Sequence, residues 1–572
     1  MSVRIKRSSL SALVFLLTAT PALAADGPIT VFVAKKIITM DPGWPEATAV
    51  AVRDGKILSV GSLDDLQPWL KSAPYKIDRT FEAKILMPGF VEPHGHPLIG
   101  GLILNLPMIT YQPTLLPYGP EFPGAKTAEK AMALMKKYVA QAKNPSEPVV
   151  IWGWDVVAMG GRHLEKTTLD KISNTQPIIV WDASEHFAYA NTAAMNRAGI
   201  KDVATHNGQF LGTTELKSIM QSELASLLAP DKAIPEIRSV LDLSARNGIT
   251  TQSELLFGGT GNSALEEKLY DEVFNKDPNV RTRLVAVADG TEAMRSKNDG
   301  AVEYVRSLAR KSTDTLIFKG VKAFTDDSFL GLGMAIENPG YIDGHTGIYI
   351  IKPGDALRDA LMPWWKAGMQ IHVHSNGNAG NQATLDALAA LQGAYPRFDH
   401  RFSIEHFGIA TPEMARRLKA LGGVASLNPY YVYTRGELGA PSFGTDRAYT
   451  AVRLKTLLDA GNTVSLHSDT PVGPPRPLEW IWIAVNRFGL SGKVLAPAER
   501  VSVVQAMKMV TIDAAYTLGV EDKIGSIQAG KFADFTVLEQ DPTAIPKKKI
   551  KDIKVWGTVV GGRVIPASGI RH

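Results

Sequence analysis

The chain has 572 residues, of which 45% are hydrophobic, so it is long enough for more than one domain and too apolar for a disordered or fibrous protein. Its net charge of +5, from 62 basic and 57 acidic residues, gives no general basis for binding nucleic acid, because such binding needs clustered positive charge. The sequence contains no cysteine, which excludes disulfides, thiolate zinc sites, iron–sulfur clusters and cysteine nucleophiles.

The first 24 residues have the pattern of a secretory signal peptide. A basic start with Arg4, Lys6 and Arg7 precedes an apolar run and the small residues of a cleavage site. The run is shorter than the roughly 20 residues that span a bilayer, which argues against an uncleaved anchor. We expect cleavage near Ala24-Ala25 and a periplasmic or secreted protein with no membrane segment. Losing three cations lowers the net charge from +5 to +2.

Short β-rich runs separated by turns occupy both ends of the mature chain. The N-terminal runs are Ile29–Val33, Ile37–Met40, Ala49–Val52 and Ile57–Val60, which predict a small antiparallel sheet. The C-terminal runs are Phe535–Leu538 and Val555–Val560. We expect both ends, 25–86 and 521–572, to form one small β-sandwich domain.

Between these ends, apolar strands alternate with helix-length segments, which is the order typical of an α/β (β/α)8 TIM barrel. The predicted strands are Ile85–His96, Gly248–Leu256, Arg281–Ala288, Ile317–Phe324, Met369–His374, Phe402–His406, Val424–Leu427 and Thr463–Asp469. The barrel is expected over 87–520. The long interval 97–247, which contains the apolar runs Val149–Trp152 and Ile178–Trp181, is interpreted as an insertion after the first strand.

Polar side chains that suit a metal site stand at the ends of these strands. The carboxyl ends of barrel strands converge on one mouth, where catalytic sites form. His94 and His96 at the end of the first strand are two positions apart, so they share a face. Later strands end near Lys322, His374, His406 and Asp469. Four imidazoles and a carboxylate suit Zn²⁺ or a similar divalent ion, whereas any one histidine alone is more often a core or surface residue.

Six motifs follow in order along the chain: Pro88–His96, Val321–Asp326, His374–Asn378, Ile404–His406, Ser468–Val472 and Gly525–Phe535. Together they resemble the metal-dependent amidohydrolase superfamily, in the branch that includes N-substituted formamide deformylases. The resemblance covers nearly the whole mature chain. It implies a metal-dependent hydrolase that acts on carbon–nitrogen bonds other than peptide bonds in a small-molecule substrate.

The resemblance also implies a role for each residue at the strand ends. His94, His96 and Asp469 would bind one Zn²⁺ ion, and His374 and His406 a second. Lys322, N6-carboxylated by carbon dioxide, would bridge the pair, since a buried lysine can lose its proton and become reactive. Asp469 would be the catalytic residue that accepts a proton from the metal-activated water and delivers it to the leaving group.

Three residues are weaker candidates for substrate contact. His186 resembles a family position near the substrate, and Asp326 follows Lys322 by four and is expected to approach the mouth. His467 shares a face with a proposed ligand and would either hydrogen-bond near the metals or fill the barrel. His372 is expected one layer deeper, as a core or supporting residue.

The leading hypothesis is an exported hydrolase of an amide, formamide or cyclic amide bond. An ester hydrolase using the same site is a close variant, because activated water attacks either carbonyl. A non-catalytic periplasmic binding or regulatory protein on this scaffold is a second alternative, disfavoured by the complete ligand set. A glycosidase barrel is disfavoured further, because it needs paired carboxylates about 5 to 9.5 Å apart. The sequence leaves the metal, the substrate and a homo-oligomer open.

Overall fold

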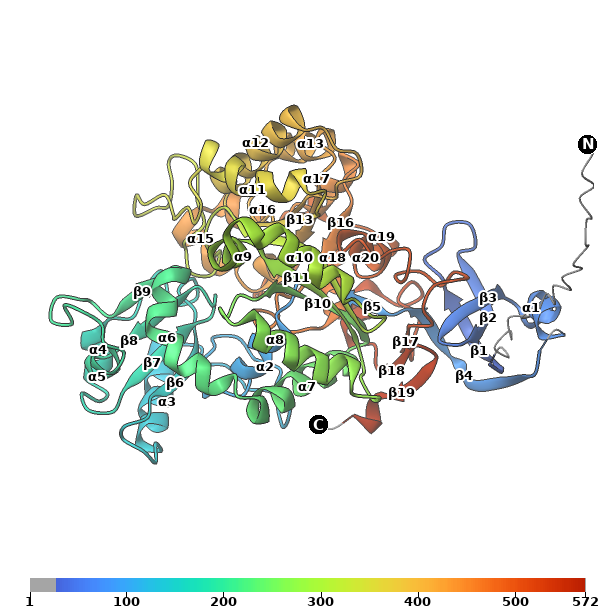
Figure 1. Ribbon diagram of the computed structural model, residues 1–572, viewed down its shortest axis with the longest axis horizontal. Helices are drawn as coiled ribbons and strands as arrows, with labels where there is room; N and C mark the ends of the chain where they lie inside the picture. Colours follow the sequence, from blue (N-terminus) through green and yellow to red (C-terminus); the bar gives the residue numbers. More distant parts are fainter. Residues whose placement is uncertain (1–26, 72, 571–572) are drawn as a thin grey trace, which may run out of the picture.

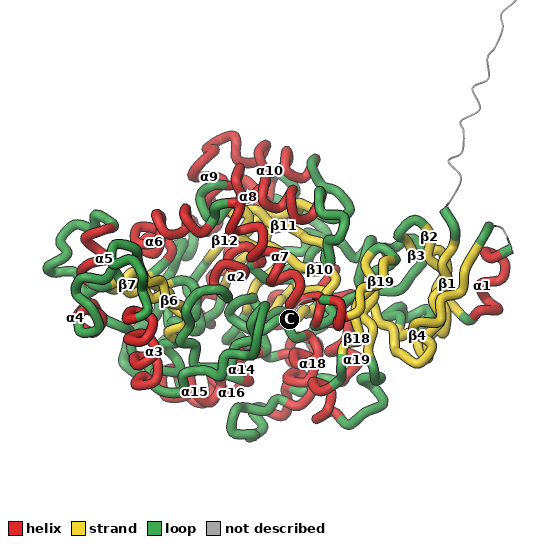
Figure 2. Tube along the Cα trace, turned by 90° about the horizontal axis from the view of Figure 1, so that it is seen from below, coloured by secondary structure: helices red, strands yellow, loops and turns green. Residues whose placement is uncertain are grey.

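The computed structural model describes residues 27–71 and 73–570. The predicted signal peptide, 1–24, therefore lies outside the described residues. A barrel occupies the centre of the structure, with the sheet formed by the chain ends on one side and the insertion on the other (Figures 1 and 2). No helix in the described ranges combines the length and apolar character needed to cross a bilayer.

The central barrel is a sheet of eight parallel strands in the order β16-β15-β14-β13-β12-β11-β10-β5. This order confirms the predicted TIM-barrel fold class. The strands are β5 (Phe90–Glu92), β10 (Ile249–Phe257), β11 (Arg283–Asp289), β12 (Leu316–Phe324), β13 (Ile371–Ser375), β14 (Ser403–His406), β15 (Val424–Leu427) and β16 (Val464–Leu466).

Helices follow the barrel strands and cover the outside of the sheet (Figure 1). They include α7 (Pro230–Arg246), α8 (Ser263–Tyr270), α9 (Gly290–Lys297), α10 (Ala301–Arg310), α11 (Asp355–Lys366), α12 (Asn378–Ala394), α13 (Pro412–Ala420), α17 (Leu454–Asp459), α18 (Pro477–Asn486), α19 (Val503–Met509) and α20 (Ile512–Thr517). Local sequence explains α13, for example: the Thr411 side chain accepts from Met414 N–H, Pro412 begins the first turn, and Lys419 lies in the last.

The predicted first strand, Ile85–His96, is in fact two strands. β4 (Tyr75–Pro88) belongs to the sheet of the chain ends and β5 to the barrel, with Gly89 between them. A Cβ at Gly89 would overlap the Thr250 side chain, so only glycine allows this close passage. His94 and His96 consequently follow the barrel strand rather than lie within it.

The chain ends together form one seven-stranded sheet in the order β19-β18-β17-β4-β1-β2-β3. Its other strands are β1 (Ile29–Ile38), β2 (Glu46–Arg53), β3 (Lys56–Gly61), β17 (Phe535–Leu538), β18 (Val555–Val560) and β19 (Arg563–Pro566). The predicted runs 29–33 and 37–40 form a single strand, β1, with a register shift between Val33 and Ile37. The prediction of a purely antiparallel sheet was wrong, because β1 pairs with β4 in parallel.

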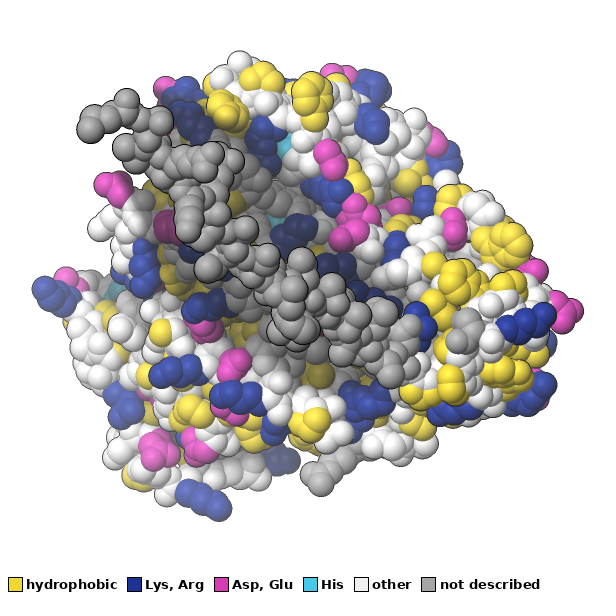
Figure 3. All heavy atoms as spheres, turned by 45° about the vertical axis from the view of Figure 1, so that its right-hand side comes forward, with side chains coloured by type: hydrophobic (Ala, Val, Ile, Leu, Met, Phe, Trp, Pro, Cys, Tyr) yellow, Lys and Arg dark blue, Asp and Glu magenta, His cyan; other side chains and the backbone are white. Residues whose placement is uncertain are grey.

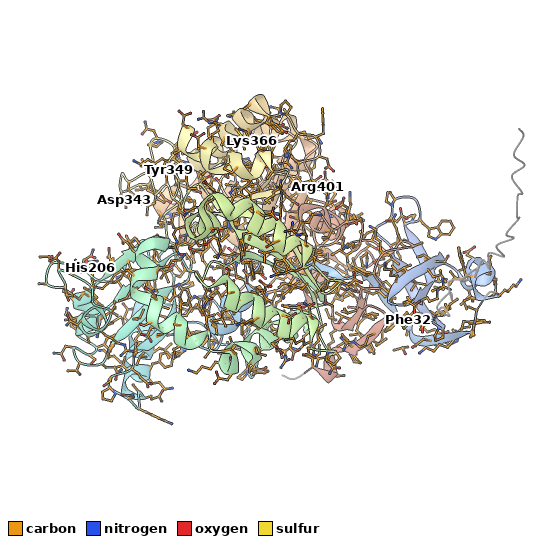
Figure 4. The ribbon with its side chains drawn as sticks, in the orientation of Figure 1. Phe32, His206, Asp343, Tyr349, Lys366 and Arg401 are labelled. Carbon is orange, nitrogen blue, oxygen red and sulfur yellow. The ribbon has the colours of Figure 1, made fainter. Side chains whose placement is uncertain are left out.

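Strands from both chain ends share one apolar core in this sheet. The ring of Phe81 on β4 lies 5.3 Å from that of Phe32 on β1 and 5.5 Å from that of Trp556 on β18, measured between centroids. Phe32 and Phe81 are fully buried, and Figure 4 labels Phe32 in the sheet. Such burial is the main favourable contribution to stability, so this sheet depends on residues from both ends.

The insertion contains a second, separate sheet in the order β6-β7-β8-β9. Its strands are β6 (Val149–Trp154), β7 (Ile178–Asp182), β8 (Phe187–Ala190) and β9 (Gln209–Leu211), and its helices include α2 (Pro97–Ile103), α3 (Ala128–Ala140), α4 (Lys166–Asp170), α5 (Thr192–Arg197) and α6 (Thr213–Leu227). His206, labelled in Figure 4, marks the outer end of this part of the molecule, far from the sheet that contains Phe32.

Charged side chains of both signs are interspersed on the surface shown in Figure 3. Lys and Arg alternate there with Asp and Glu, which agrees with the near balance of charge in the sequence.

A buried ion pair joins the barrel to the C-terminal strands. Arg283 at the start of β11 donates from Nε to Asp534 Oδ2 at 2.6 Å and from Nη2 to Oδ1 at 3.0 Å. The two side chains are 5% and 2% exposed, so neither charge is solvated by water if its partner is lost.

We expect Asp534→Ala to lower the free energy of unfolding by about 3–5 kcal/mol, because it leaves the Arg283 guanidinium buried without a counter-charge. Denaturant unfolding followed by circular dichroism measures this change. Glu413→Ala, at a residue whose side chain is 73% exposed, is the control and should leave the transition unchanged. An Asp534→Ala transition equal to that of the control would contradict the structural importance of this pair.

Candidate metal centre

All six predicted metal ligands line one pocket of about 140 Å³ at the mouth of the barrel: His94, His96, Lys322, His374, His406 and Asp469. Five of them are at most 9% exposed, and the side chain of His96 is 13% exposed. The structure thus brings together residues separated by up to 375 positions in the sequence. A cluster of this kind is largely shielded from bulk water. Electrostatic interactions within it are therefore stronger than they would be in water.

The first group of ligand atoms surrounds Asp469. Its Oδ1 lies 3.4 Å from His94 Nε2 and 3.3 Å from His96 Nε2. Lys322 Nζ lies 3.2 Å from the same His94 Nε2. The Nε2 atoms of both histidines therefore point toward the Asp469 carboxylate, and that of His94 also lies beside Lys322.

Backbone hydrogen bonds hold this group together across the seam between the first and last barrel strands. His96 N–H donates to Thr470 O and Asp469 N–H donates to His94 O, each at 3.0 Å. The buried Glu92 carboxylate also accepts from Ser468 N–H, at 3.1 Å. Strand ends β5 and β16, which are not neighbours in the hydrogen-bonded sheet order, are thus joined at the mouth.

Two carboxylates that the sequence interpretation missed orient the first two histidines. Glu405 Oε2 lies 2.8 Å from His94 Nδ1, and Glu254 Oε1 lies 2.9 Å from His96 Nδ1. Glu254 also accepts from Tyr270 OH at 2.5 Å. A carboxylate on Nδ1 fixes the proton there and leaves Nε2 free to bind a metal.

The second group consists of histidines from neighbouring strands. His406 Nε2 lies 3.0 Å from His374 Nδ1. The opposite nitrogens are also occupied, since His374 Nε2 contacts Asn376 Nδ2 at 3.0 Å and His406 Nδ1 contacts His467 Nε2 at 3.2 Å. His374 Nδ1 and His406 Nε2 are therefore the two atoms that converge.

Left-handed backbone at two proposed ligands changes which way strand residues face. His406 has φ 74° and Asp469 has φ 60°. Regular alternation would aim Glu405 and His406 at opposite faces, but the turn at His406 lets both reach the interior. Non-glycine residues in this region are strained and often mark functional sites.

Electrostatics at Lys322 favour a neutral, reactive amine. Burial lowers the pKa of Lys322 to about 8, although the carboxylates of Glu405 and Asp469 raise it. With this pKa, about one molecule in ten has Lys322 as a free amine at pH 7, far more than for a lysine with the ordinary pKa.

The three weaker candidates lie in different surroundings. His186 lines the pocket, with Nδ1 3.1 Å from Asp327 Oδ1. Asp326 is fully buried and does not line the metal pocket. Its carboxylate accepts from the N–H groups of Ala335, Asn376 and Gly377, each at 2.8 Å. Asp326 was expected to approach the mouth of the barrel, but these three backbone N–H groups hold its carboxylate away from the pocket.

His467 and His372 also lie outside the pocket lining. His467 bridges His406 and Ser426, with Nδ1 2.7 Å from Ser426 Oγ, so it supports a proposed ligand rather than facing a substrate. His372 contacts the second oxygen of Glu405 at 2.7 Å, one layer deeper in the barrel as expected.

This chain resembles known proteins over most of its length. The profile of the amidohydrolase family matches residues 82–566. The chain belongs to the amidohydrolase family. This amidohydrolase is 27% identical over 551 residues to Protein LONG AFTER FAR-RED 3 of Arabidopsis thaliana, covering 92% of this chain and 90% of that protein. It is 24% identical over 548 residues to N-substituted formamide deformylase of Arthrobacter pascens, covering 92% and 96%.

A solved structure supports the same fold. An uncharacterized metal-dependent hydrolase of Pyrococcus horikoshii OT3 superposes with a TM-score of 0.69 at 19% identity, covering 91% of this chain and 99% of that one. Family membership makes this amidohydrolase a metal-dependent hydrolase of carbon–nitrogen bonds other than peptide bonds, with a divalent metal site.

The residues of the amidohydrolase fit such a metal site. Two groups of the described residues, His94/His96/Asp469 and His94/His406/His467, can each bring three ligand atoms within 4.8 Å of one another. Burial alone would lower the pKa of His96, but hydrogen bonds to Asp469 and Glu254 raise it to about 10. Two carboxylates thus stabilise positive charge at this position, as a cation site requires.

We expect Glu405→Gln to weaken metal binding by about 10–100-fold, because it removes the carboxylate that orients His94 and His372. Competition with a chromophoric chelator, combined with elemental analysis of the dialysed protein, measures the affinity. Glu413→Gln on the surface is the matched control. Unchanged affinity in Glu405→Gln would show that the His94 ring is oriented by other contacts.

Proposed function

We propose that the protein is an exported hydrolase that cleaves an amide, formamide or cyclic amide bond of a small molecule, using two Zn²⁺ ions bridged by N6-carboxylated Lys322. The observation that carries the proposal is the convergence of four imidazoles, Lys322 and Asp469 in one buried pocket. His94, His96 and Asp469 would hold one ion and His374 and His406 the other. The similarity to N-substituted formamide deformylase supports the choice of bond.

Carboxylation of Lys322 is supported by its surroundings. As an ammonium it would repel two divalent ions, whereas burial favours the neutral amine that reacts with carbon dioxide. The resulting carbamate offers two oxygens and a negative charge. Divalent ions at these residues supply Lewis acidity, which polarises a carbonyl and acidifies water.

Asp469 has the position and charge of the proton-transferring residue. Although burial opposes its ionised form, interactions with His94 and His96 hold the pKa of Asp469 well below its usual range. It lies between both imidazoles, so it can take a proton from water at the mouth and return it to the leaving nitrogen. An ester with the same shape would use the same groups, which keeps ester hydrolysis as the alternative.

Metal and activity measurements on Lys322→Ala test the proposal. We expect bound zinc to fall from about two ions per chain to about one, and turnover of N-substituted formamides, N-acyl amines and cyclic amides to be lost, because the bridge is absent. Asp469→Asn should lower kcat by about 10²–10⁴-fold. Glu413→Gln is the control.

Full turnover and full zinc content in Lys322→Ala would contradict the proposed bridging of two zinc ions by Lys322. Hydrolysis of matched esters without hydrolysis of amides would favour the alternative function. Binding of small molecules with no turnover of either, in zinc-loaded protein, would favour a binding or regulatory protein.

Export is tested by expressing the whole chain in a Gram-negative host and comparing it with a chain that begins at Ala25. We expect the whole chain to be recovered from the periplasm or medium with its first residue at Ala25, as mass spectrometry would show. The shorter chain should remain in the cytoplasm. Recovery of the whole chain uncleaved in the cytoplasm would refute export.

A further inference from the structure

Glu185 lies half-buried in the wall of the metal pocket, and one of its two carboxyl oxygens has no hydrogen-bond partner among the described residues. Its Oε1 atom is buried and accepts no hydrogen bond in the part of the chain that the structure describes. Burying a carboxyl group in this state costs free energy, so an unsatisfied one in a native structure calls for an explanation. One explanation is a bound ligand that donates a hydrogen bond to this oxygen.

Two other carboxylates in the same pocket wall accept hydrogen bonds, and a lysine of the insertion there lies near a carboxylate. Glu254 contacts His96 and Tyr270, as described above. Glu266 accepts from Gly258 N–H at 2.6 Å and from Thr260 N–H at 3.1 Å. Lys217 on α6 lies 3.6 Å from Glu292. Glu185 Oε1 therefore differs from these carboxylates in having no hydrogen-bond donor within the described ranges, although His96 and His186 lie close enough to lower the pKa of Glu185.

The backbone holds Glu185 in a strained but well-defined turn. Its φ is 68°, in the left-handed region that glycine adopts more readily. Glu185 N–H donates to Asp182 O at 3.1 Å, and Trp181 Nε1 donates to Glu185 O at 3.2 Å. Strain of this kind persists where surrounding contacts enforce it, and it clusters at ligand-binding positions.

The rest of the pocket wall is largely apolar. Trp181 lies in the wall, and Leu98, Leu216, Leu224, Leu256 and Phe324 also line the pocket. An indole attracts cations through its π face, and a nearby carboxylate adds charge. Apolar walls with an indole ring and a carboxyl oxygen that has no donor suit an apolar molecule that carries a single cationic group.

We propose that Glu185 and Trp181 bind a protonated amine of the substrate, so that the compound hydrolysed is an amide with an apolar body and an ammonium group. This inference rests on the proposed function for the identity of the bond cleaved, and it assigns Glu185 as a specificity residue. Burial raises the pKa of Glu185 to about 8 although His96 and His186 lower it, and an ammonium ligand would supply the hydrogen-bond donor that Oε1 lacks, together with a further positive charge.

Binding of two amides of equal size tests this assignment without relying on turnover. The probes are 4-(aminomethyl)benzamide, which carries an ammonium group, and 4-ethylbenzamide, which does not. Calorimetry on the zinc-loaded full chain should give a dissociation constant at least tenfold lower for the ammonium probe. In Glu185→Gln the difference should fall below twofold while 4-ethylbenzamide binds as before. Glu185→Asp, which keeps the charge, should retain part of the preference, and Glu413→Gln all of it.

A wild-type preference below twofold would overturn the assignment, and so would a preference that survives Glu185→Gln. The wild-type comparison decides the matter even if a variant fails to fold. Turnover of the same two amides separates this inference from the proposed function. A binding preference without hydrolysis would support the ammonium site and contradict amide hydrolysis of these probes. Hydrolysis of both probes at equal efficiency and equal affinity would support amide hydrolysis and contradict the ammonium site.

Discussion

Closure of the barrel between β5 and β16 is the constraint on which the site depends. The sheet order ends at these two strands, and the backbone bonds that join them lie at the mouth, between the segments that carry His94, His96 and Asp469. The contacts that complete the barrel are therefore the same contacts that set the spacing of the first group of ligand atoms. Glu92 reinforces this seam from inside, because its buried carboxylate accepts from Ser468. Any change that opened the seam would move Asp469 away from both imidazoles.

Much of this arrangement could be predicted because regular strands repeat every two residues and end at one mouth. The alternation of strands and helices predicted the eight barrel strands, and the convergence of their ends predicted that the six strand-end residues lie in one pocket. Prediction failed where the backbone leaves regular geometry. Glu405 is in register with His374 and so faces inward on the regular strand, whereas left-handed φ turns His406 inward beside it. Alternation counted from His406 therefore gave no sign that Glu405 orients His94. The break at Gly89 follows from a close contact with Thr250, which is 161 residues away in the sequence and therefore invisible to local patterns.

The site combines two sources with different roles. The barrel supplies the residues proposed to bind metal, and their positions follow from strand pairing. The insertion supplies Trp181, Glu185 and His186 from the end of β7 and the turn after it, together with the apolar face of α6. Under the proposed function, the chemistry and the choice of substrate would thus rest on separate segments of the chain. This separation explains why the resemblance to a family identifies the reaction class more readily than the compound that is hydrolysed.

The sheet of the chain ends has a consequence for the order in which the protein folds as it emerges, N-terminus first. β4 lies between β1 and β17, and β17 leads on to β18 and β19, so the sheet lacks three of its seven strands until residue 566 has emerged. Until then one side of β4 is an open strand edge, and open edges invite pairing with other chains. Phe81 likewise lacks Trp556, its partner from the C-terminal strands. The first strands of this sheet to emerge are therefore among the last parts to reach their final packing. A chain cut short within its last 40 residues would keep the whole barrel sequence but have an unfinished edge.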